Sequence, residues 1–145
     1  MSAAPYDDSV SERLAALCTK MGLPIERVLL YQLSYDELAT ELVCHDVMVA
    51  VRLHGAVAAA AAGIPTICLA YEDKCWDHQL SIGAEQWTCN TDDADRETLA
   101  QMLTDLITNP GHQKQLVEPR IERLIEAQHL AAEQVIHELQ SAVAA

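Results

Sequence analysis

Residues 47–71 read VMVAVRLHGAVAAAAAGIPTICLAY, and this stretch predicts the fold of the chain. Residues 47–51 and 66–70 are short apolar runs, which are typical of strands buried on both faces of a parallel sheet. Between them, a polar turn leads into an alanine-rich helix. The stretch therefore predicts a β-α-β unit. Its turn, at residues 52–55, lies at the carboxyl end of the first strand, where open parallel sheets bind ligands.

Helix and strand patterns also precede this unit. A capping box, in which a Ser and a Glu three residues later cap a helix start, occurs at Ser9 with Glu12 and again at Ser34 with Glu37. The first predicts an amphipathic helix that stops near Gly22, and the second predicts a helix that ends at about Cys44. Residues 28–31 are apolar and predict a strand between the two helices.

After the central unit, the sequence predicts a loop that leads into a short helix ending near Gly83, and then an edge strand at residues 85–88. A further helix, capped by Asp93 or Asp95, ends at residues 109–111. The last helix runs from Gln113 nearly to the end of the chain, and Pro119 either kinks it or starts its main part. Its apolar stripe comprises Ile121, Ile125, Ala132, Ile136, Leu139 and Val143.

Length and composition are consistent with one layered domain. The chain has 145 residues, of which 50% are hydrophobic, but aromatic residues make up only 4% and Phe is absent. A core of Leu, Val, Ile and Ala suits an α/β fold better than a β-sandwich. We therefore predict a single three-layer α/β domain over residues 1–145, with a mostly parallel sheet of about four strands and a long C-terminal helix.

Charge and cysteine content exclude several classes of protein. The formal net charge of −13 argues against binding to nucleic acid or to an anionic membrane surface, because both require a basic face. The 5 cysteines are mostly in apolar segments, which favours structural thiols in a reducing compartment. The sequence shows no secretory signal and no uncharged run of the roughly 20 residues that span a bilayer. We therefore expect a soluble cytoplasmic protein.

The cations of the central region are few. Between Arg27 and Arg96, the Lys and Arg residues are Arg52 and Lys74, and each follows one of the two central strands. Adjacent parallel strands lie about 5 Å apart, so side chains that leave their carboxyl ends can converge on one ligand. His54 and residue 55 begin the following helix, whose free N–H groups and positive dipole end also favour an anion.

This pattern has a second interpretation. Arg52 and Lys74 are equally explained as surface residues paired with nearby acids, for which Glu72, Asp73 and Asp77 are available, and His54 as a capping or solvated side chain. Two other patterns are incomplete. Cys75 and His78 have the spacing of half a zinc site, but no matching second pair is evident, and the Asp92, Asp93 and Asp95 cluster is explained by helix capping. We expect no metal and no cofactor.

The central stretch resembles the polysaccharide pyruvyl transferase family. The resemblance is carried by Arg52-Leu53-His54 after the first strand, by Gly63-Ile64-Pro65 before the second, and by Tyr71 with Lys74 three residues later. It implies a Rossmann-like domain that corresponds to the second half of a GT-B-like enzyme. The first strand of this half and the amino-terminal partner domain are then expected to lie outside the chain, on a companion chain or elsewhere.

The resemblance also implies an activity and roles for four residues. A family member transfers the enolpyruvyl unit of phosphoenolpyruvate to a sugar, which becomes a pyruvate ketal in exopolysaccharide biosynthesis. Arg52 would bind the phosphate or carboxylate, His54 would donate a proton to the methylene carbon, and Lys74 and the N–H groups near Gly55 would hold the phosphate. Protonation creates an electrophilic carbon for a sugar hydroxyl, and the cations stabilise the departing phosphate.

Two other functions are consistent with the sequence. One is the donor-binding half of a GT-B glycosyltransferase that uses a sugar nucleotide, since such enzymes share the fold. The other is a non-catalytic interaction domain, such as a homo-oligomer, that packs its long last helix on another chain. The sequence does not identify the acceptor sugar.

Overall fold

The computed structural model describes residues 5–24 and 33–143. Contacts within the chain divide it into two units, residues 1–41 and 42–145. No helix in the described ranges has the length and apolar character needed to cross a membrane.

The first unit contains helix α1 (Pro5–Lys20), and helix α2 (Tyr35–Leu42) lies at its end. The predicted capping box of α2 is confirmed, because the Ser34 N–H donates to the Glu37 carboxylate at 2.8 Å and the Glu37 N–H donates to the Ser34 hydroxyl at 3.3 Å. The prediction that α1 starts at Ser9 is wrong. Pro5 can begin the helix because the first helical position needs no N–H donor. The strand predicted at residues 28–31 lies outside the described residues.

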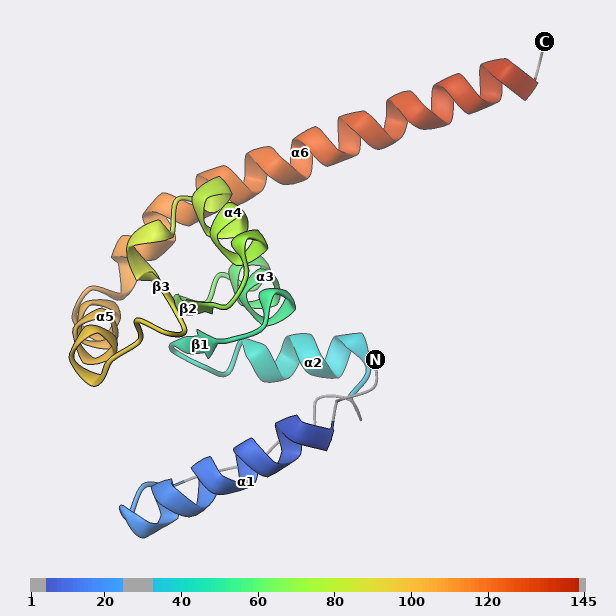
Figure 1. Ribbon diagram of the computed structural model, residues 1–145. Helices are drawn as coiled ribbons and strands as arrows, with labels where there is room; N and C mark the ends of the chain where they lie inside the picture. Colours follow the sequence, from blue (N-terminus) through green and yellow to red (C-terminus); the bar gives the residue numbers. More distant parts are fainter. Residues whose placement is uncertain (1–4, 25–32, 144–145) are drawn as a thin grey trace. The chain divides into compact units, whose positions relative to one another are not determined.

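The second unit is mixed α/β (Figure 1). Its elements in chain order are β1 (Met48–Ala50), α3 (Leu53–Ala61), β2 (Thr66–Ala70), α4 (Asp73–Ile82), the 3₁₀ helix η2 (Glu85–Trp87), β3 (Thr88–Asn90), α5 (Arg96–Thr108) and α6 (Pro110–Val143). Within the described residues the sheet has three parallel strands in the order β1-β2-β3. Met48 is in register with Thr66, and Cys68 with Thr88. The α/β class, the parallel sheet and the long last helix are confirmed, whereas a fourth strand is not.

Three predicted boundaries are corrected. Helix α4 begins at Asp73, directly after β2, without the predicted loop, and ends at Gly83 as predicted, with φ 73°. Residues 85–87 form η2, so the last strand begins only at Thr88. Trp87, the last residue of η2, is 1% exposed. The alternation of side chains along an extended strand would not by itself place this residue in the core. Helix α6 begins at Pro110 rather than Gln113, and Pro119 lies inside it.

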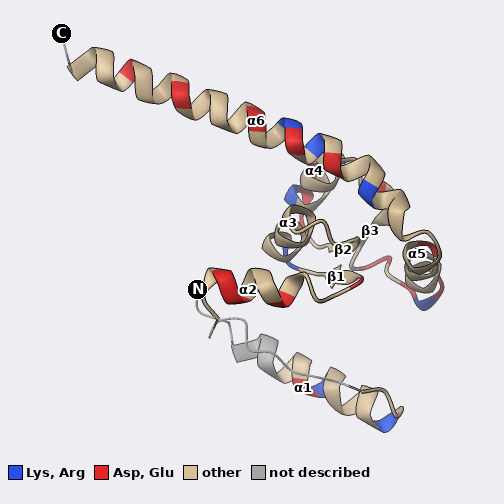
Figure 2. Cartoon of the chain, turned by 180° about the vertical axis from the view of Figure 1, so that it is seen from behind, with Lys and Arg blue, Asp and Glu red and all other residues tan. Residues whose placement is uncertain are grey.

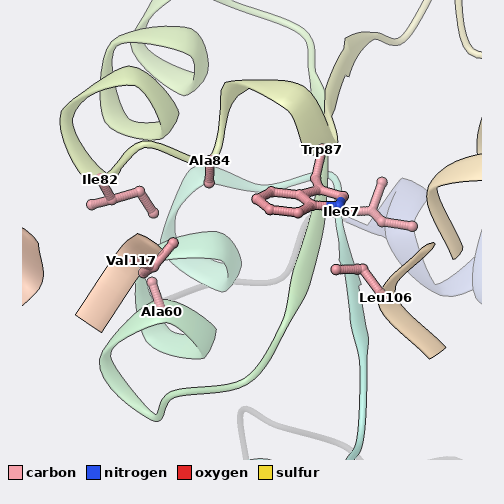
Figure 3. Close-up of a cluster of buried hydrophobic side chains, with 7 residues drawn as sticks. All are labelled: Ala60, Ile67, Ile82, Ala84, Trp87, Leu106 and Val117. Atoms are coloured by element: carbon pink, nitrogen blue, oxygen red, sulfur yellow. The ribbon is translucent and has the colours of Figure 1, made fainter. Parts of the chain in front are cut away.

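Neighbouring residues of β2 enter two different buried clusters. Ile67 packs in a cluster with Trp87 and Leu106 (Figure 3). Cys68 packs in a second cluster with residues of α3 and α4. Strand β2 is therefore covered on both faces, as predicted. The same prediction is wrong for β1, because Val49 on that strand is 52% exposed.

Trp87 is the largest fully buried side chain. Its indole N–H donates to the Asp105 carboxylate at 2.9 Å, and its ring meets the ring of His112 edge to face, with centroids 5.4 Å apart. Because both its apolar body and its polar N–H are satisfied by the protein, Trp87 has a packing role.

The amino end of β2 is held by a side chain from α6. The Thr66 N–H donates to the Gln113 side-chain oxygen at 2.6 Å, and the Gln113 amide donates to the Thr66 carbonyl at 2.8 Å. Both residues are buried. The amide of Gln113 thus pairs with Thr66 as a neighbouring strand would, and it connects α6 to the sheet.

Candidate anion-binding edge of the sheet

The carboxyl ends of all three strands lie at one edge of the sheet, because the strands are parallel. After β1 the chain continues to Arg52, and after β2 it continues to Tyr71. After β3, the Thr91 N–H donates to the Ala70 carbonyl at 2.9 Å, which keeps the ends of β2 and β3 together. The predicted site residues therefore follow strands that end at a common edge.

The start of α3 supplies backbone donors at this edge. Arg52 is the N-cap residue with extended backbone angles, φ −93° and ψ 134°. Its carbonyl accepts hydrogen bonds from the N–H groups of Gly55 at 2.9 Å and Ala56 at 3.2 Å. The Gly55 N–H is thus used inside the first turn. By helix geometry, the donors that point out of the helix start belong to Leu53 and His54.

Gly55 instead allows α3 to lie close to β1. A Cβ atom at this position would be 3.2 Å from the Met48 Cε atom and 3.7 Å from the Ala50 Cβ atom. Further along α3, Ala56 and Ala59 have no exposed surface. The small residues of this helix therefore hold its N-terminus firmly against the sheet edge.

Helix α4 places Lys74 near the end of β2. The Lys74 Nζ atom lies 2.7 Å from the Glu72 carboxylate and 5.4 Å from the centroid of the Tyr71 ring. The hydrogen bond to Glu72 raises the pKa of Lys74, and a hydrogen bond to Tyr71 raises it further. The alternative interpretation thus applies to Lys74, which pairs with a neighbouring acid. An exposed pair of this kind is weak and can exchange for a competing anion.

The starts of α3 and α4 pack together. Leu53 and Trp76, from the first turns of the two helices, contact the cluster that contains Ala56, Cys68 and Cys75. The side chains of Arg52, His54 and Lys74 are all exposed. The structure therefore brings the elements that carry the predicted cations to the same edge, while the convergence of the three side chains on one ligand stays a prediction.

The thiols beneath this edge are structural. Cys68 and Cys75 are fully buried, and burial, with a smaller effect from Cys75, raises the pKa of the Cys68 thiol to about 11. Burial also raises the pKa of Cys89. Because the thiolate is the reactive form, neutral buried thiols are poor nucleophiles.

A pair of linked side-chain hydrogen bonds at the carboxyl end of β3 was not predicted. The Trp76 indole N–H donates to the Asn90 side-chain oxygen at 2.7 Å, and the Asn90 amide donates to the Asp93 carboxylate at 3.0 Å. No local sequence pattern indicates these bonds, since Trp76 and Asn90 are on different elements. They fix the indole of Trp76, which is partly buried beside the candidate edge.

The acidic cluster caps α5, as predicted for Asp95. The Thr98 N–H donates to the Asp95 carboxylate at 2.7 Å, and this bond lowers the pKa of Asp95. In the described part of the chain, no group of three His, Cys, Asp or Glu side chains is arranged to hold a metal ion.

A small, partly open pocket of about 20 Å³ lies away from the candidate edge, at the amino end of β2. Its lining includes Gly63, Thr66, Gln79 and Gln113. The Gln79 amide is buried with no hydrogen-bond partner among the described residues. A cavity of this size holds about one water molecule, so it is too small for a sugar or a phosphorylated substrate.

The fold and this edge together define an α/β protein that presents a helix N-terminus and exposed cations where parallel strands end. Residues 3–73 match the model of the family described as Polysaccharide pyruvyl transferase. The resemblance inferred from Arg52, His54 and Gly63 is therefore confirmed. Among curated proteins and among solved structures, no significant match to the chain was found.

The matched family indicates a class of activity, and the matched range covers only part of the chain. The family's description indicates pyruvyl transfer to polysaccharide and so implies a sugar acceptor. The matched range includes β1, α3 and β2, and it ends at Asp73. Arg52, His54 and Gly55 thus lie inside it, whereas Lys74 lies one residue beyond.

Proposed function

We propose that the carboxyl edge of the sheet binds phosphoenolpyruvate and contributes to transfer of its pyruvyl unit to a sugar. The single observation that carries this proposal is the position of Arg52 and His54. They lie at the start of a closely packed helix, at the carboxyl end of a parallel strand, within the range that matches the family. Backbone donors at a helix start favour an anionic ligand.

Each residue has a role in this proposal. Arg52 binds the phosphate or the carboxylate, since a guanidinium matches the geometry of either group. The N–H groups of Leu53 and His54 donate hydrogen bonds to a further ligand oxygen. Lys74 exchanges Glu72 for the phosphate, which is possible because the pair is exposed to solvent.

The transfer needs one proton donor. His54, in its protonated form, gives a proton to the methylene carbon of phosphoenolpyruvate, so the double bond is lost and the adjacent carbon becomes electrophilic. A sugar hydroxyl forms a bond to that carbon and releases its proton. The bond from the carbon to the phosphate oxygen then breaks and phosphate leaves with the electron pair. A second hydroxyl of the sugar forms a bond to the same carbon and releases its proton, which completes the ketal. Arg52 and Lys74 stabilise the charge of the departing phosphate.

Ligand protection against heat tests the binding step. Phosphoenolpyruvate at 100 times its Kd should stabilise the chain by about 2.7 kcal/mol, which raises the melting temperature. Arg52→Ala should remove this increase, while Arg96→Ala, which changes an exposed arginine at the start of α5, should retain it. An unchanged melting temperature at millimolar ligand would refute the proposal. A response to a sugar nucleotide instead would indicate the glycosyltransferase alternative.

Isotope exchange tests the proton transfer. In D₂O, the wild type with a polysaccharide acceptor should transfer a pyruvyl group that carries deuterium in its methyl group. His54→Gln should reduce the rate about 10²- to 10⁴-fold, because general acid catalysis contributes on this scale, and should leave ligand protection in place. Full turnover by this variant would exclude His54 as the donor.

A further inference from the structure

The far part of α6 carries an uncovered apolar surface. Residues 122–143 are all exposed, and they include Val135 at 56% and Leu139 at 62%. The other large apolar side chains of this part are Leu124, Ile125, Leu130, Ile136 and Val143. In water, an amphipathic helix is stabilised mainly when its apolar face packs against another surface. This part of α6 therefore requires a partner.

The spacing of the apolar residues indicates what kind of partner fits. One line along α6 advances in alternating steps of four and three residues and comprises Ile121, Ile125, Gln128, Ala132, Val135, Leu139 and Ala142. This is the 3.5-residue repeat by which one helix packs along another in a coiled coil. We call these seven residues the α6 seam. A long helix with a matching seam is the appropriate partner, and α6 itself is one.

We propose that α6 pairs with α6 of a second copy of the chain, in antiparallel orientation. In a symmetric antiparallel register, Ile121 faces the partner's Leu139, Ile125 faces the partner's Val135, and Gln128 faces the partner's Ala132. Large apolar side chains thus meet each other, and the polar amide of Gln128 lies opposite the small Ala132. A parallel pair would place Gln128 against Gln128 and leave a gap between the two Ala132 side chains.

The charges of α6 also favour the antiparallel orientation. Its Lys and Arg residues, Lys114, Arg120 and Arg123, lie in the first part of the helix, and the part after Arg123 contains Glu126, Glu133 and Glu138 but no Lys or Arg (Figure 2). Antiparallel pairing places the arginines of one copy near the acidic end of the other. Parallel pairing would align the acidic ends of two chains that each carry a net charge of −13.

The position of the folded part supports the same orientation. Residues 122–143 span about 33 Å at 1.5 Å per residue. In an antiparallel pair, the rest of the two second units lies at opposite ends of this length and does not compete for space. The inference does not depend on the proposed catalytic function, because the α6 seam is separate from Arg52 and His54.

The oligomeric state of the 145-residue chain tests the pairing. We expect a dimer in sedimentation equilibrium at micromolar concentration. Ala132→Glu places a charge in the α6 seam and should raise the dissociation constant at least tenfold. Ala127→Glu makes the same change outside the seam of the same helix and should leave the constant within about twofold. Circular dichroism of both variants checks that helix content is equal.

Three results would overturn the pairing. A monomer at all concentrations would show that the surface is covered by something other than a second copy. A dimer that neither substitution weakens, or that both weaken equally, would show that the seam is not the contact.

A distance measurement tests the orientation separately. Spin labels at Ser141→Cys, with Cys18 and Cys44 changed to serine, should be about 33 Å apart in the antiparallel pair. A distance distribution centred below about 20 Å would show parallel helices and would refute the orientation. The remaining cysteines are buried and are not expected to be labelled.

Discussion

The two ends of strand β2 differ in almost every respect. At the amino end, Thr66 is buried and both of its backbone groups pair with Gln113 from α6. At the carboxyl end, Tyr71 is 39% exposed, and the nearby Arg52 and Lys74 are exposed as well. The same strand is thus fixed at one end and exposed to solvent at the other, which we call its open end. Substitutions near the fixed end, or in the core beside it, should change stability, and substitutions at the open end should change binding.

The largest effect is expected for Trp87→Ala. Loss of this side chain, 1% exposed in the structure, leaves a cavity and removes the indole donor from the Asp105 carboxylate, so the free energy of unfolding should fall by about 3–5 kcal/mol. Trp76→Ala removes a partly exposed indole and should cost clearly less. Denaturant titration of both variants measures the difference. Equal losses would contradict the assignment of Trp87 to the core and Trp76 to the candidate anion-binding edge.

The next largest effect is expected for Gln113→Ala. The substitution leaves the buried N–H and carbonyl of Thr66 without their partner, and an unsatisfied buried group costs about 1–3 kcal/mol. Gln115→Ala, at an exposed position of the same helix, provides the matched control. Thermal unfolding should show a lower midpoint for Gln113→Ala alone. The increase in melting temperature that phosphoenolpyruvate causes should stay the same in both variants.

A fall in pH should lower the free energy of unfolding through His78. Burial lowers the pKa of His78 below its usual 6.5, and its Nε2 atom is buried without a partner among the described residues. As the pH falls through 6.5, the unfolded chain takes up a proton that the folded chain resists, so stability decreases until the lowered pKa is reached. His78→Gln should flatten stability between pH 7 and pH 5. The exposed His54→Gln should not, and an equally flat profile for His54→Gln would contradict this cause.

The smallest effect is expected at the open end. Glu72→Gln removes the acid that pairs with Lys74, so an anion no longer competes with it. The affinity for phosphoenolpyruvate should increase by no more than about fivefold, because exposed ion pairs are weak. Calorimetric titration beside Glu85→Gln, another exposed acid, isolates the effect. A loss of affinity would show that Glu72 holds Lys74 in the binding position.

Local patterns in the sequence predicted local structure well. The apolar run at residues 66–70 coincides with β2, the Ser34 and Glu37 capping box is present, and Gly83 ends α4 with the positive φ that favours glycine. Each of these features depends on residues that are close in sequence. The common edge from which the chain continues to Arg52 and Lys74 was also predictable. Strands that run parallel in one sheet have their carboxyl ends at the same edge.

Features that depend on distant residues could not be predicted. The bonds between Thr66 and Gln113 join positions 47 residues apart, and the bond from Trp87 to Asp105 also crosses elements. The strand predicted at residues 85–88 is present but shifted to Thr88–Asn90, because residues 85–87 form η2, which ends with the buried Trp87. At the site, the pairing of Lys74 with Glu72 depends on side-chain geometry, which the sequence left as one of two alternatives.

The lack of bulk in α3 has a consequence for the evolution of this edge. With Gly55 close to the Met48 Cε atom, and Ala56 and Ala59 without exposed surface, an added methyl group would require the neighbouring side chains or the helix itself to shift. Where the helix shifts, the backbone donors at its start move with it. During evolution, the exposed polar side chains at the sheet edge can therefore be exchanged for others that bind new ligands. Substitutions of the small buried residues of α3 would be tolerated least.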